Sequence, residues 1–396
     1  MCKTEKIVTL AEKFRDYTAK NLSEIVKIPS LSGEEGDVIE KLAELCTEAG
    51  FDDVRVDGLG NLIGRVGSGP RIIAIDAHID TVDTGDLSQW DFAPFCGEIK
   101  DGKVLGRGTV DQSGGAASMI TAGRILKELA YDGEFSVLFT FTVMEEDCDG
   151  LCWNYLIEKE SIRPEIAIIT EPTNLGLYRG HRGRMEIECY FSGVSCHGSA
   201  PERGINAIYK ASRASLKIEE LNERLIADDF LGKGTVAVTL IESQSPSLCA
   251  VSDFAHFHLD RRLTWGETKQ SALAEVRDAI GSQAQIEVPI YSKASYKGTL
   301  FEMEKYYPTW KIEEDNQYIR TGIDCYRGLF EDEPRIDKWT FSTNGVAICG
   351  KHGIPCIGFG PGNEIYAHAP NEAVPIDHLV KASAFYALYP YLLKGE

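Results

Sequence analysis

Two glutamates, Glu145 and Glu146, stand side by side at the end of a long apolar run in TFTVMEEDCDG (140–150). Two more acidic residues, Asp147 and Asp149, follow closely. The cluster is either a solvated acidic turn or a pair of carboxylates that divides one task, with one side chain held as a ligand and the other free to move a proton. On an extended segment successive side chains diverge, so the two glutamates can face different partners.

Further histidines and carboxylates stand at the ends of predicted strands and helices. His78 and Asp80 end the apolar run RIIAIDAHID, and a carboxylate two residues from a histidine can accept its second ring N–H. The other candidates follow GRGTV, EIAIIT and GFGPG: Asp111, Glu171 and His368. Each has an ordinary explanation when taken alone, as a surface histidine, a helix N-cap or a loop carboxylate. Together these nitrogen and oxygen ligands suit Zn²⁺, Co²⁺ or Mn²⁺, and one shared carboxylate allows two ions side by side.

A sheet domain of the α/β class is expected to position these residues. The first 180 residues alternate helical patterns with short apolar runs, and polar residues just beyond strand ends are the usual place for chemistry in such a sheet. Ser32 to Glu35 has the spacing of a capping box that opens a helix through Ala49. The other predicted elements are an amphipathic helix over 1–26, a helix over 111–129 whose first turns are small residues, and strands over 71–80, 134–146 and 165–170.

The pattern changes after about residue 184. From MEIECYFSGV to QIEVPIYS the chain is predicted to run strand, helix, strand, strand, helix, strand, which is the ferredoxin-like order. The α/β pattern then returns in a helix near 312–328, a strand over 354–360 and a closing helix after Pro375. A chain of 396 residues is long enough for two domains. We therefore expect a discontinuous metal-binding domain of residues 1–183 and 296–396, with residues 184–295 inserted into it.

Taken in order, the motifs resemble those of the M20 metallopeptidases, a family of dipeptidases, aminoacylases, N-carbamoyl amidohydrolases and succinyl-diaminopimelate desuccinylase. The resemblance extends along nearly the whole chain and rests on HIDTV, GRGTVDQSGG, the glutamate pair, TEPT, HGSAPERGINAI and HAPNE. The stretches EEDCDGLCW, RGRMEI, GVSCHGSAPERG, DRRLTWGET and DKWTFSTNGV are closer still to the YgeY-type branch, named for its link to selenium metabolism. The resemblance implies a zinc-peptidase-like three-layer α/β/α catalytic domain, with the ferredoxin-like α+β insertion as a lid that also forms a homodimer.

The resemblance also implies two divalent metal ions in each subunit, zinc by preference and cobalt or manganese as alternatives. Asp111 would bridge the two ions. His78 and Glu171 would complete one site, and Glu146 and His368 the other.

Catalytic roles follow from the same resemblance. Glu145 would be the general base that holds the metal-bridging water, and Asp80 would be the partner of His78. His197 would come from the lid, across the dimer in many members of the family, to stabilise the oxyanion. Cys196 beside it is not expected to be a nucleophile, because adjacent residues on a strand point apart.

Residues for substrate binding are implied with alternatives left open. Arg262, or Arg261 beside it, matches the lid arginine that often grips a substrate carboxylate, and the alternative is a surface salt bridge. Asn344, in the turn FSTNG, is expected to contact substrate. One departure from the family is Ser113, which stands where lysine is common after the bridging Asp111 and puts any charge contact of that lysine in doubt.

The function implied is hydrolysis of an amide-type C–N bond in a small N-substituted amino acid, either N-acyl or N-carbamoyl. A dipeptidase or aminopeptidase of the same family is the first alternative. A non-catalytic small-molecule-binding dimer is the rival of another class. Such a protein could lose the general base while keeping the metal ligands, and Glu145 is present in this sequence.

Composition excludes several other functions. A net charge of −20 argues against nucleic acid or an anionic membrane as a partner, and no run of 18 apolar residues is present. Eleven cysteines, an odd number without regular spacing, predict reduced thiols in a cytoplasmic protein. Cys148 and Cys152 lack a second pair at zinc-ribbon spacing. GLGNLIG does not have the spacing of a dinucleotide-binding turn, and there is neither a P-loop nor a serine nucleophile elbow.

Overall fold

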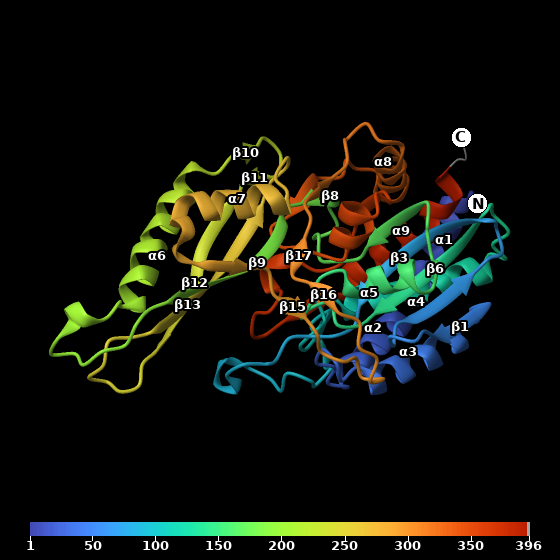
Figure 1. Ribbon diagram of the computed structural model, residues 1–396. Helices are drawn as coiled ribbons and strands as arrows, with labels where there is room; N and C mark the ends of the chain where they lie inside the picture. Colours follow the sequence, from blue (N-terminus) through green and yellow to red (C-terminus); the bar gives the residue numbers. More distant parts are fainter. Residues whose placement is uncertain (394–396) are drawn as a thin grey trace.

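A nine-stranded mixed sheet forms the centre of the larger of two bodies (Figure 1). The structure is a computed structural model and describes residues 1–393. Along the sheet the strands are β1 (Asp53–Val56), β2 (Leu62–Val66), β6 (Phe135–Thr142), β3 (Arg71–His78), β7 (Ile166–Ile169), β20 (Cys356–Gly358), β8 (Leu177–His181) and β18 (Trp310–Lys311), with β19 (Ile336–Trp339) also paired to β8. A small three-stranded sheet lies beside it, made of β21 (Ala373–Pro375), β5 (Lys103–Leu105) and β4 (Ile99–Lys100).

Three parallel strands at the middle of the large sheet bring their carboxyl ends to one edge. β3 lies between β6 and β7, with His78 opposite Thr142 and Asp76 opposite Ile169. The residues that follow these strands are therefore neighbours in space, although they are far apart in the sequence. β6 is shorter than the predicted strand over 134–146, because the chain turns sharply after Thr142.

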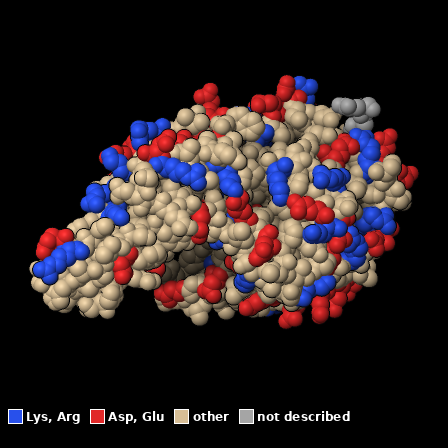
Figure 2. All heavy atoms as spheres, in the orientation of Figure 1, with Lys and Arg blue, Asp and Glu red and all other residues tan. Residues whose placement is uncertain are grey.

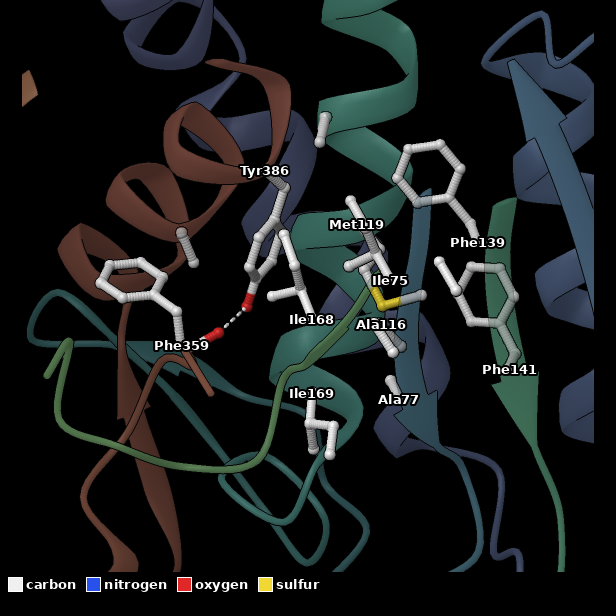
Figure 3. Close-up of a cluster of buried hydrophobic side chains, with 14 of the residues drawn as sticks. Ile75, Ala77, Ala116, Met119, Phe139, Phe141, Ile168, Ile169, Phe359 and Tyr386 are labelled. Atoms are coloured by element: carbon white, nitrogen blue, oxygen red, sulfur yellow. Dashed lines mark hydrogen bonds between the residues drawn. The ribbon is translucent and has the colours of Figure 1, made fainter. Parts of the chain in front are cut away.

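Helices cover both faces of this sheet, as a three-layer α/β/α fold requires. The side chains of β3 alternate, so Ile75 and Ala77 face Ala116 and Met119, and Tyr386 packs in the same cluster (Figure 3). On this side lie α1 (Lys3–Lys13), α2 (Arg15–Val26), α4 (Ser113–Glu128), α8 (Gln317–Phe330) and α9 (Ile376–Leu392), with α3 (Gly36–Glu48) near β1 and β2. The buried carboxylate of Asp76 points to the opposite face, where α5 (Leu151–Glu158) and the π-helix η4 (Val346–Lys351) pack together.

The small residues at the start of α4 allow the close approach that the sequence predicts. A Cβ on Gly115 would lie 2.2 Å from Oγ1 of Thr170, the residue that precedes Glu171 at the end of β7. Only glycine fits here, and it lets the first turn of α4 lie directly against the strand end.

Three helix predictions need correction. The predicted capping box at Ser32 does not form, because α3 begins at Gly36 and Ser32 donates its hydroxyl hydrogen to Asp80 instead. The N-terminal helix is two helices that meet at Phe14. The helix predicted near 312–328 begins later, at Gln317, where the side chain of Asn316 caps it.

A separate antiparallel sheet and two helices form the second body, which we call the lid (Figure 1). Its strands lie in the order β12 (Thr235–Gln244), β13 (Phe254–Leu263), β9 (Gly183–Ser192) and β14 (Gln285–Glu287), with the short β17 (Tyr306–Tyr307) also paired to β9. The helices are α6 (Ala207–Arg224) and α7 (Lys269–Ile280). The lid has a hydrophobic core of its own, and its chain order β9-α6-β12-β13-α7-β14 confirms the predicted α/β fold with a ferredoxin-like insertion. The exact boundaries at 183/184 and 295/296 stay a prediction.

Within residues 1–393, no helix is both long and apolar enough to cross a membrane.

A buried histidine at the base of the lid makes stability dependent on pH. Nε2 of His181 accepts hydrogen bonds from the Trp310 indole N–H (2.7 Å) and the Thr343 amide (3.1 Å), so the ring must stay neutral. Burial lowers the pKa of His181 to about 4, against 6.5 for the free side chain.

The unfolded chain binds this proton more readily, so the contribution of His181 to stability is complete above pH 6.5 and is lost as the pH falls towards 4. We expect a loss of about 3 kcal/mol over this interval from this residue alone. Urea unfolding of His181→Gln between pH 4 and 7 should show a shallower dependence on pH than the wild type. Parallel curves for the two proteins would contradict this prediction.

Candidate metal centre

The structure brings together all five residues that were predicted to be metal ligands. Oδ1 of Asp111 lies 2.9 Å from Nε2 of His78, and its Oδ2 lies 3.3 Å from Nε2 of His368. On the first side Glu171 Oε1 is 3.5 Å from His78 Nε2, and on the other side Glu146 Oε2 is 2.9 Å from His368 Nε2. The Asp111 carboxylate therefore stands between two groups of ligands, each with one histidine and one glutamate.

Each ligand comes from the end of a different element. His78 is the last residue of β3, Asp111 precedes α4, and Glu171 lies just beyond β7. Glu146 follows β6, and His368 lies in the loop between β20 and β21. The positions therefore follow from the parallel strands that share one sheet edge.

Asp80 lies beside His78 and also makes contacts that the sequence did not predict. Nδ1 of His78 lies 2.9 Å from the backbone oxygen of Asp80 and 3.5 Å from its carboxylate, so the closer acceptor is the carbonyl. The buried carboxylate accepts hydrogen bonds from the Ser32 hydroxyl (2.6 Å) and from the backbone N–H groups of Glu145 (3.1 Å) and Glu146 (3.0 Å). Asp80 thus holds the backbone of the glutamate pair.

The glutamate pair lies in a turn and not on an extended strand. Met144 has a φ of 63°, a left-handed conformation that is unusual for a residue other than glycine. Its amide donates to the buried carboxylate of Glu35 (3.1 Å). This turn, together with Asp80, lets Glu146 reach His368, while Glu145 Oε2 lies 4.0 Å from His78 Nε2.

The electrostatics of the cluster show a concentration of negative charge away from water. Burial, and then the Asp111 carboxylate, raise the pKa of Glu171 well above its ordinary value. Burial also raises the pKa of Glu145 well above its ordinary value, and that of Glu146 to about 7. Hydrogen bonds to Asp111 and Glu146 raise the pKa of His368 to about 10. So many buried carboxylates need a compensating positive charge.

Divalent cations fit this requirement. Oε1 of Glu145 and Oε2 of Glu171 are buried and have no hydrogen-bond partner. Two sets of three residues each offer ligand atoms within 4.8 Å of one another: His78, Glu145 and Glu171, and His78, Asp111 and Glu146. Imidazole nitrogen and carboxylate oxygen are suitable ligands for Zn²⁺, Co²⁺ and Mn²⁺.

A cavity of about 300 Å³ opens above these residues and is shared with the lid. Arg262 lines it, whereas the neighbouring Arg261 is fully buried and bound to Glu267 and Glu275 inside the lid. This settles which of the two arginines faces the site. In the space-filling view, a hollow separates the lid from the larger body, and acidic side chains stand at its rim (Figure 2).

Two predicted site residues are not brought to the cavity within the chain. Asn344 is 1% exposed. Its side-chain N–H groups donate to Asp76 (2.9 Å) and Thr142 (3.1 Å), and its side-chain oxygen accepts from the backbone N–H of Gly150 (3.1 Å). It therefore supports the sheet from behind and is not a lining residue. His197 is exposed on a loop of the lid, where its ring contacts Ser199.

Sequence reasoning missed a buried glutamate that supports the metal-binding loop. Glu372 belongs to the HAPNE motif and is fully buried. Its oxygens accept hydrogen bonds from the amides of Val110 (2.6 Å) and Asp111 (3.0 Å) and from Arg107 Nη1 (2.9 Å). The sequence around Glu372 gave no sign of these contacts, because the partners lie 261 to 265 residues earlier in the chain.

The two aspartates that follow the glutamate pair are bound to opposite connections of the lid. Asp147 Oδ2 accepts from the hydroxyl of Tyr291 (2.9 Å) and from Nζ of Lys293 (3.1 Å), on the segment that leaves the lid. Asp149 Oδ1 lies 3.2 Å from Nη2 of Arg184, near the start of β9, by which the chain enters the lid. Both are therefore structural contacts of this turn.

The fold and the cluster of ligands at its sheet edge define a metallohydrolase of the M20 type, and the chain belongs to peptidase family M20/M25/M40, whose sequence profile matches residues 74–391. It is similar to the uncharacterized protein YgeY of Escherichia coli strain K12, with 50% identity over 98% of both chains. A succinyl-diaminopimelate desuccinylase of Cereibacter sphaeroides strain ATCC 17029 is 28% identical, with 92% of this chain and 95% of that protein covered.

A solved structure shares the fold along nearly the whole length. The Bacillus subtilis protein YXEP, described as a dinuclear metal binding peptidase from the M20 family, superposes with a TM-score of 0.70 at 15% identity, covering 96% of this chain and 98% of the other. The predicted family membership and fold class are confirmed.

We expect Glu372→Gln to destabilise the protein strongly. The variant leaves Arg107 buried without its ionic partner and gives the amides of Val110 and Asp111 a weaker acceptor, so the loss should be about 3–5 kcal/mol. The matched control is Glu333→Gln, which breaks the exposed pair with Arg327 and should cost at most about 1 kcal/mol. Urea denaturation measures both, and equal losses would contradict the role given to Glu372.

Proposed function

We propose that this chain is a dinuclear-metal-dependent hydrolase that cleaves an amide-type C–N bond in a small N-substituted amino acid, with an N-acyl or N-carbamoyl group as the part removed. The observation that carries the proposal is the Asp111 carboxylate, whose two oxygens face His78 and His368 separately. The desuccinylase relative, which by its name removes an acyl group from an amino acid, supports this choice of substrate class.

The ligands divide into two sets around Asp111. His78 and Glu171 would hold one ion, and Glu146 and His368 the other. When bound, the two ions lower the pKa of water and polarise the carbonyl of the scissile bond. Zinc is the first choice, and cobalt and manganese suit the same ligands.

Glu145 is the residue we assign to proton transfer. Its Oε1 is buried and has no partner, and Glu145 lines the cavity beside the ligands that we assign to the two ions without being one of them. It takes a proton from the attacking water and delivers it to the leaving nitrogen. The Asp80 carboxylate fixes the backbone of this residue and so keeps the carboxyl group in position.

Two groups of the lid serve the substrate. The guanidinium of Arg262 reaches the cavity and is suited to hold the substrate carboxylate by two parallel hydrogen bonds. His197 lies outside the cavity of its own chain, so we assign it to the cavity of a partner subunit, where it donates to the carbonyl oxygen under attack. Asn344 is left out of the substrate site because its amide is fully used within the sheet.

A homodimer through the lid is part of this proposal. β12 is an edge strand, and its Leu240 and Ile241 are exposed, as are Tyr209 and Leu216 on the adjacent α6. Exposed apolar residues on an edge strand and a neighbouring helix favour association with a second copy. We also infer a cytoplasmic location, because all eleven cysteines are free thiols in the part of the chain that the structure describes.

The proposed base is tested by Glu145→Gln. We expect this variant to keep two metal ions per chain and to lose about 10²–10⁴ in kcat, because the ligands remain while proton transfer fails. Metal content by mass spectrometry and turnover of N-acyl, N-carbamoyl and dipeptide substrates measure the two effects. The exposed Glu134→Gln serves as the control and should match the wild type.

The same N-acyl, N-carbamoyl and dipeptide substrates also distinguish the proposed function from its alternatives. Chelation should abolish wild-type turnover, and added Zn²⁺ or Mn²⁺ should restore it. Turnover of dipeptides alone would favour the peptidase alternative. A Glu145→Gln variant with full activity, or a metal-loaded wild type that binds these compounds and turns over none, would point to another base or to the non-catalytic dimer.

The dimer is tested by Leu216→Glu. This exposed residue of α6 should tolerate the change within the chain, but the new charge would be buried in the interface. We expect light scattering to show the mass of one chain for the variant and of two for the wild type, with activity lost together with the dimer. Val8→Glu, exposed on α1 of the larger body, should stay dimeric and active.

A further inference from the structure

Two arginines stand directly opposite each other at the base of the lid. Arg184 on β9 pairs in register with Arg262 on the neighbouring β13. Residues opposite each other on antiparallel strands project from the same face, with Cβ atoms about 4.5–5.5 Å apart. Both arginines line the cavity that contains the metal-ligand cluster.

Two like charges opposite each other on adjacent strands repel, so the presence of both arginines on this wall of the cavity requires an explanation. A single arginine is enough to hold one carboxylate by two hydrogen bonds. A second guanidinium beside it is not needed for such a substrate, although Arg184 also forms an ion pair with Asp149. The pair is of use when the ligand brings a second negative charge to the same wall of the cavity.

Each arginine has a protein carboxylate of its own and keeps donors to spare. Arg262 uses Nε and Nη2 for Asp260, at 2.8 and 3.0 Å, and this leaves Nη1. Arg184 uses Nη2 for Asp149, lies 4.6 Å above the ring of Tyr307, and has a buried Nε without any partner. The two ion pairs hold the guanidinium groups in place without using all of their N–H groups.

We propose that Arg184 and Arg262 together select a substrate with two carboxylates. Building on the function proposed above, the preferred substrate is an N-substituted amino acid that carries a second acidic group, either on the amino-acid side chain or on the acyl group removed. Arg262 holds the carboxylate common to all substrates, and Arg184 is the specificity-determining residue for the second one. Its side chain comes from the RGRMEI segment.

Besides Glu145 and the carboxylates that we assign to the metal ions, two acidic side chains line the cavity and define the competing possibility. Asp149 is paired with Arg184 through one oxygen and accepts from the hydroxyl of Ser342 through the other, so its charge is already compensated within the protein. Glu364 also lines the cavity and is half-buried. A substrate with a cationic side chain would use Glu364, and the experiment includes this case.

The experiment compares substrates that differ by one charge at nearly constant shape. N-acetylglutamate against N-acetylglutamine tests the amino-acid side chain, and N-succinylalanine against its succinamoyl analogue tests the acyl group. We expect the metal-loaded wild type to prefer the acid at least about tenfold in kcat/KM in one of the two pairs, and that pair identifies the source of the second carboxylate. N-acetyllysine against N-acetylnorleucine tests the cationic alternative.

Substitution of Arg184 should change the preference between acid and amide substrates, whereas substitution of Arg262 should change KM. In Arg184→Gln the preference for the acid should fall about tenfold or more, and in Arg184→Lys by less, because lysine keeps the charge and loses the planar fork. In Arg262→Gln, KM should rise for both members of a pair. A purely structural role of Arg184 at the base of the lid would reduce both members equally and leave the ratio unchanged, which would overturn the proposal.

Binding separates this inference from the function on which it rests. Calorimetry of the four acid and amide compounds on metal-loaded Glu145→Gln measures the preference for the acid in binding, without turnover, and adding Arg184→Lys to this variant should weaken that preference. Acid selectivity in binding with no hydrolysis by the wild type would keep the inference and reject the proposed reaction. Hydrolysis without a preference for the acid, or with a preference for N-acetyllysine, would reject the inference and keep the reaction.

Discussion

The carboxylate of Asp80 is the point on which the geometry of the metal centre depends. It is fully buried and accepts hydrogen bonds from the backbone of both Glu145 and Glu146 and from Ser32. A buried carboxylate that lost these donors would carry a large desolvation penalty, so the turn cannot relax without breaking a charged network. The preceding Met144, in its left-handed conformation, is held in turn by Glu35.

A buried carboxylate that accepts from backbone amides also holds a second loop of the site. Glu372 holds the loop that carries Asp111 by accepting from successive backbone amides, as Asp80 holds the glutamate pair. Gly115 lets the helix that follows lie against the end of β7. Most of the proposed ligands thus lie just beyond the end of a helix or strand, where buried carboxylates and a close helix contact tie the chain to the sheet. Rigid placement of this kind is what binding of a metal ion by short, charged side chains requires.

Residue type and spacing were enough to predict that these histidines and carboxylates meet at one sheet edge, because parallel strands that end together bring their following residues together. The motifs of the family then assigned the ligands to two ions. What spacing did not reveal are the contacts made between distant segments: Ser32 resembled a helix cap and binds Asp80, Asn344 resembled a substrate contact and lies behind the sheet. Arg184 gave no signal of its own, since its position opposite Arg262 exists only once β9 and β13 are in register.

The turn at 145–150 also has a mechanical consequence. Two connecting segments join the lid to the larger body, and this turn contacts both of them. Asp149 binds Arg184 where the chain enters the lid, and Asp147 binds Tyr291 and Lys293 where it leaves. A rotation of the lid about these segments moves both anchors relative to the strands that end at Thr142 and His78. Any change in the angle between the lid and the larger body would therefore strain the turn that carries Glu145 and Glu146.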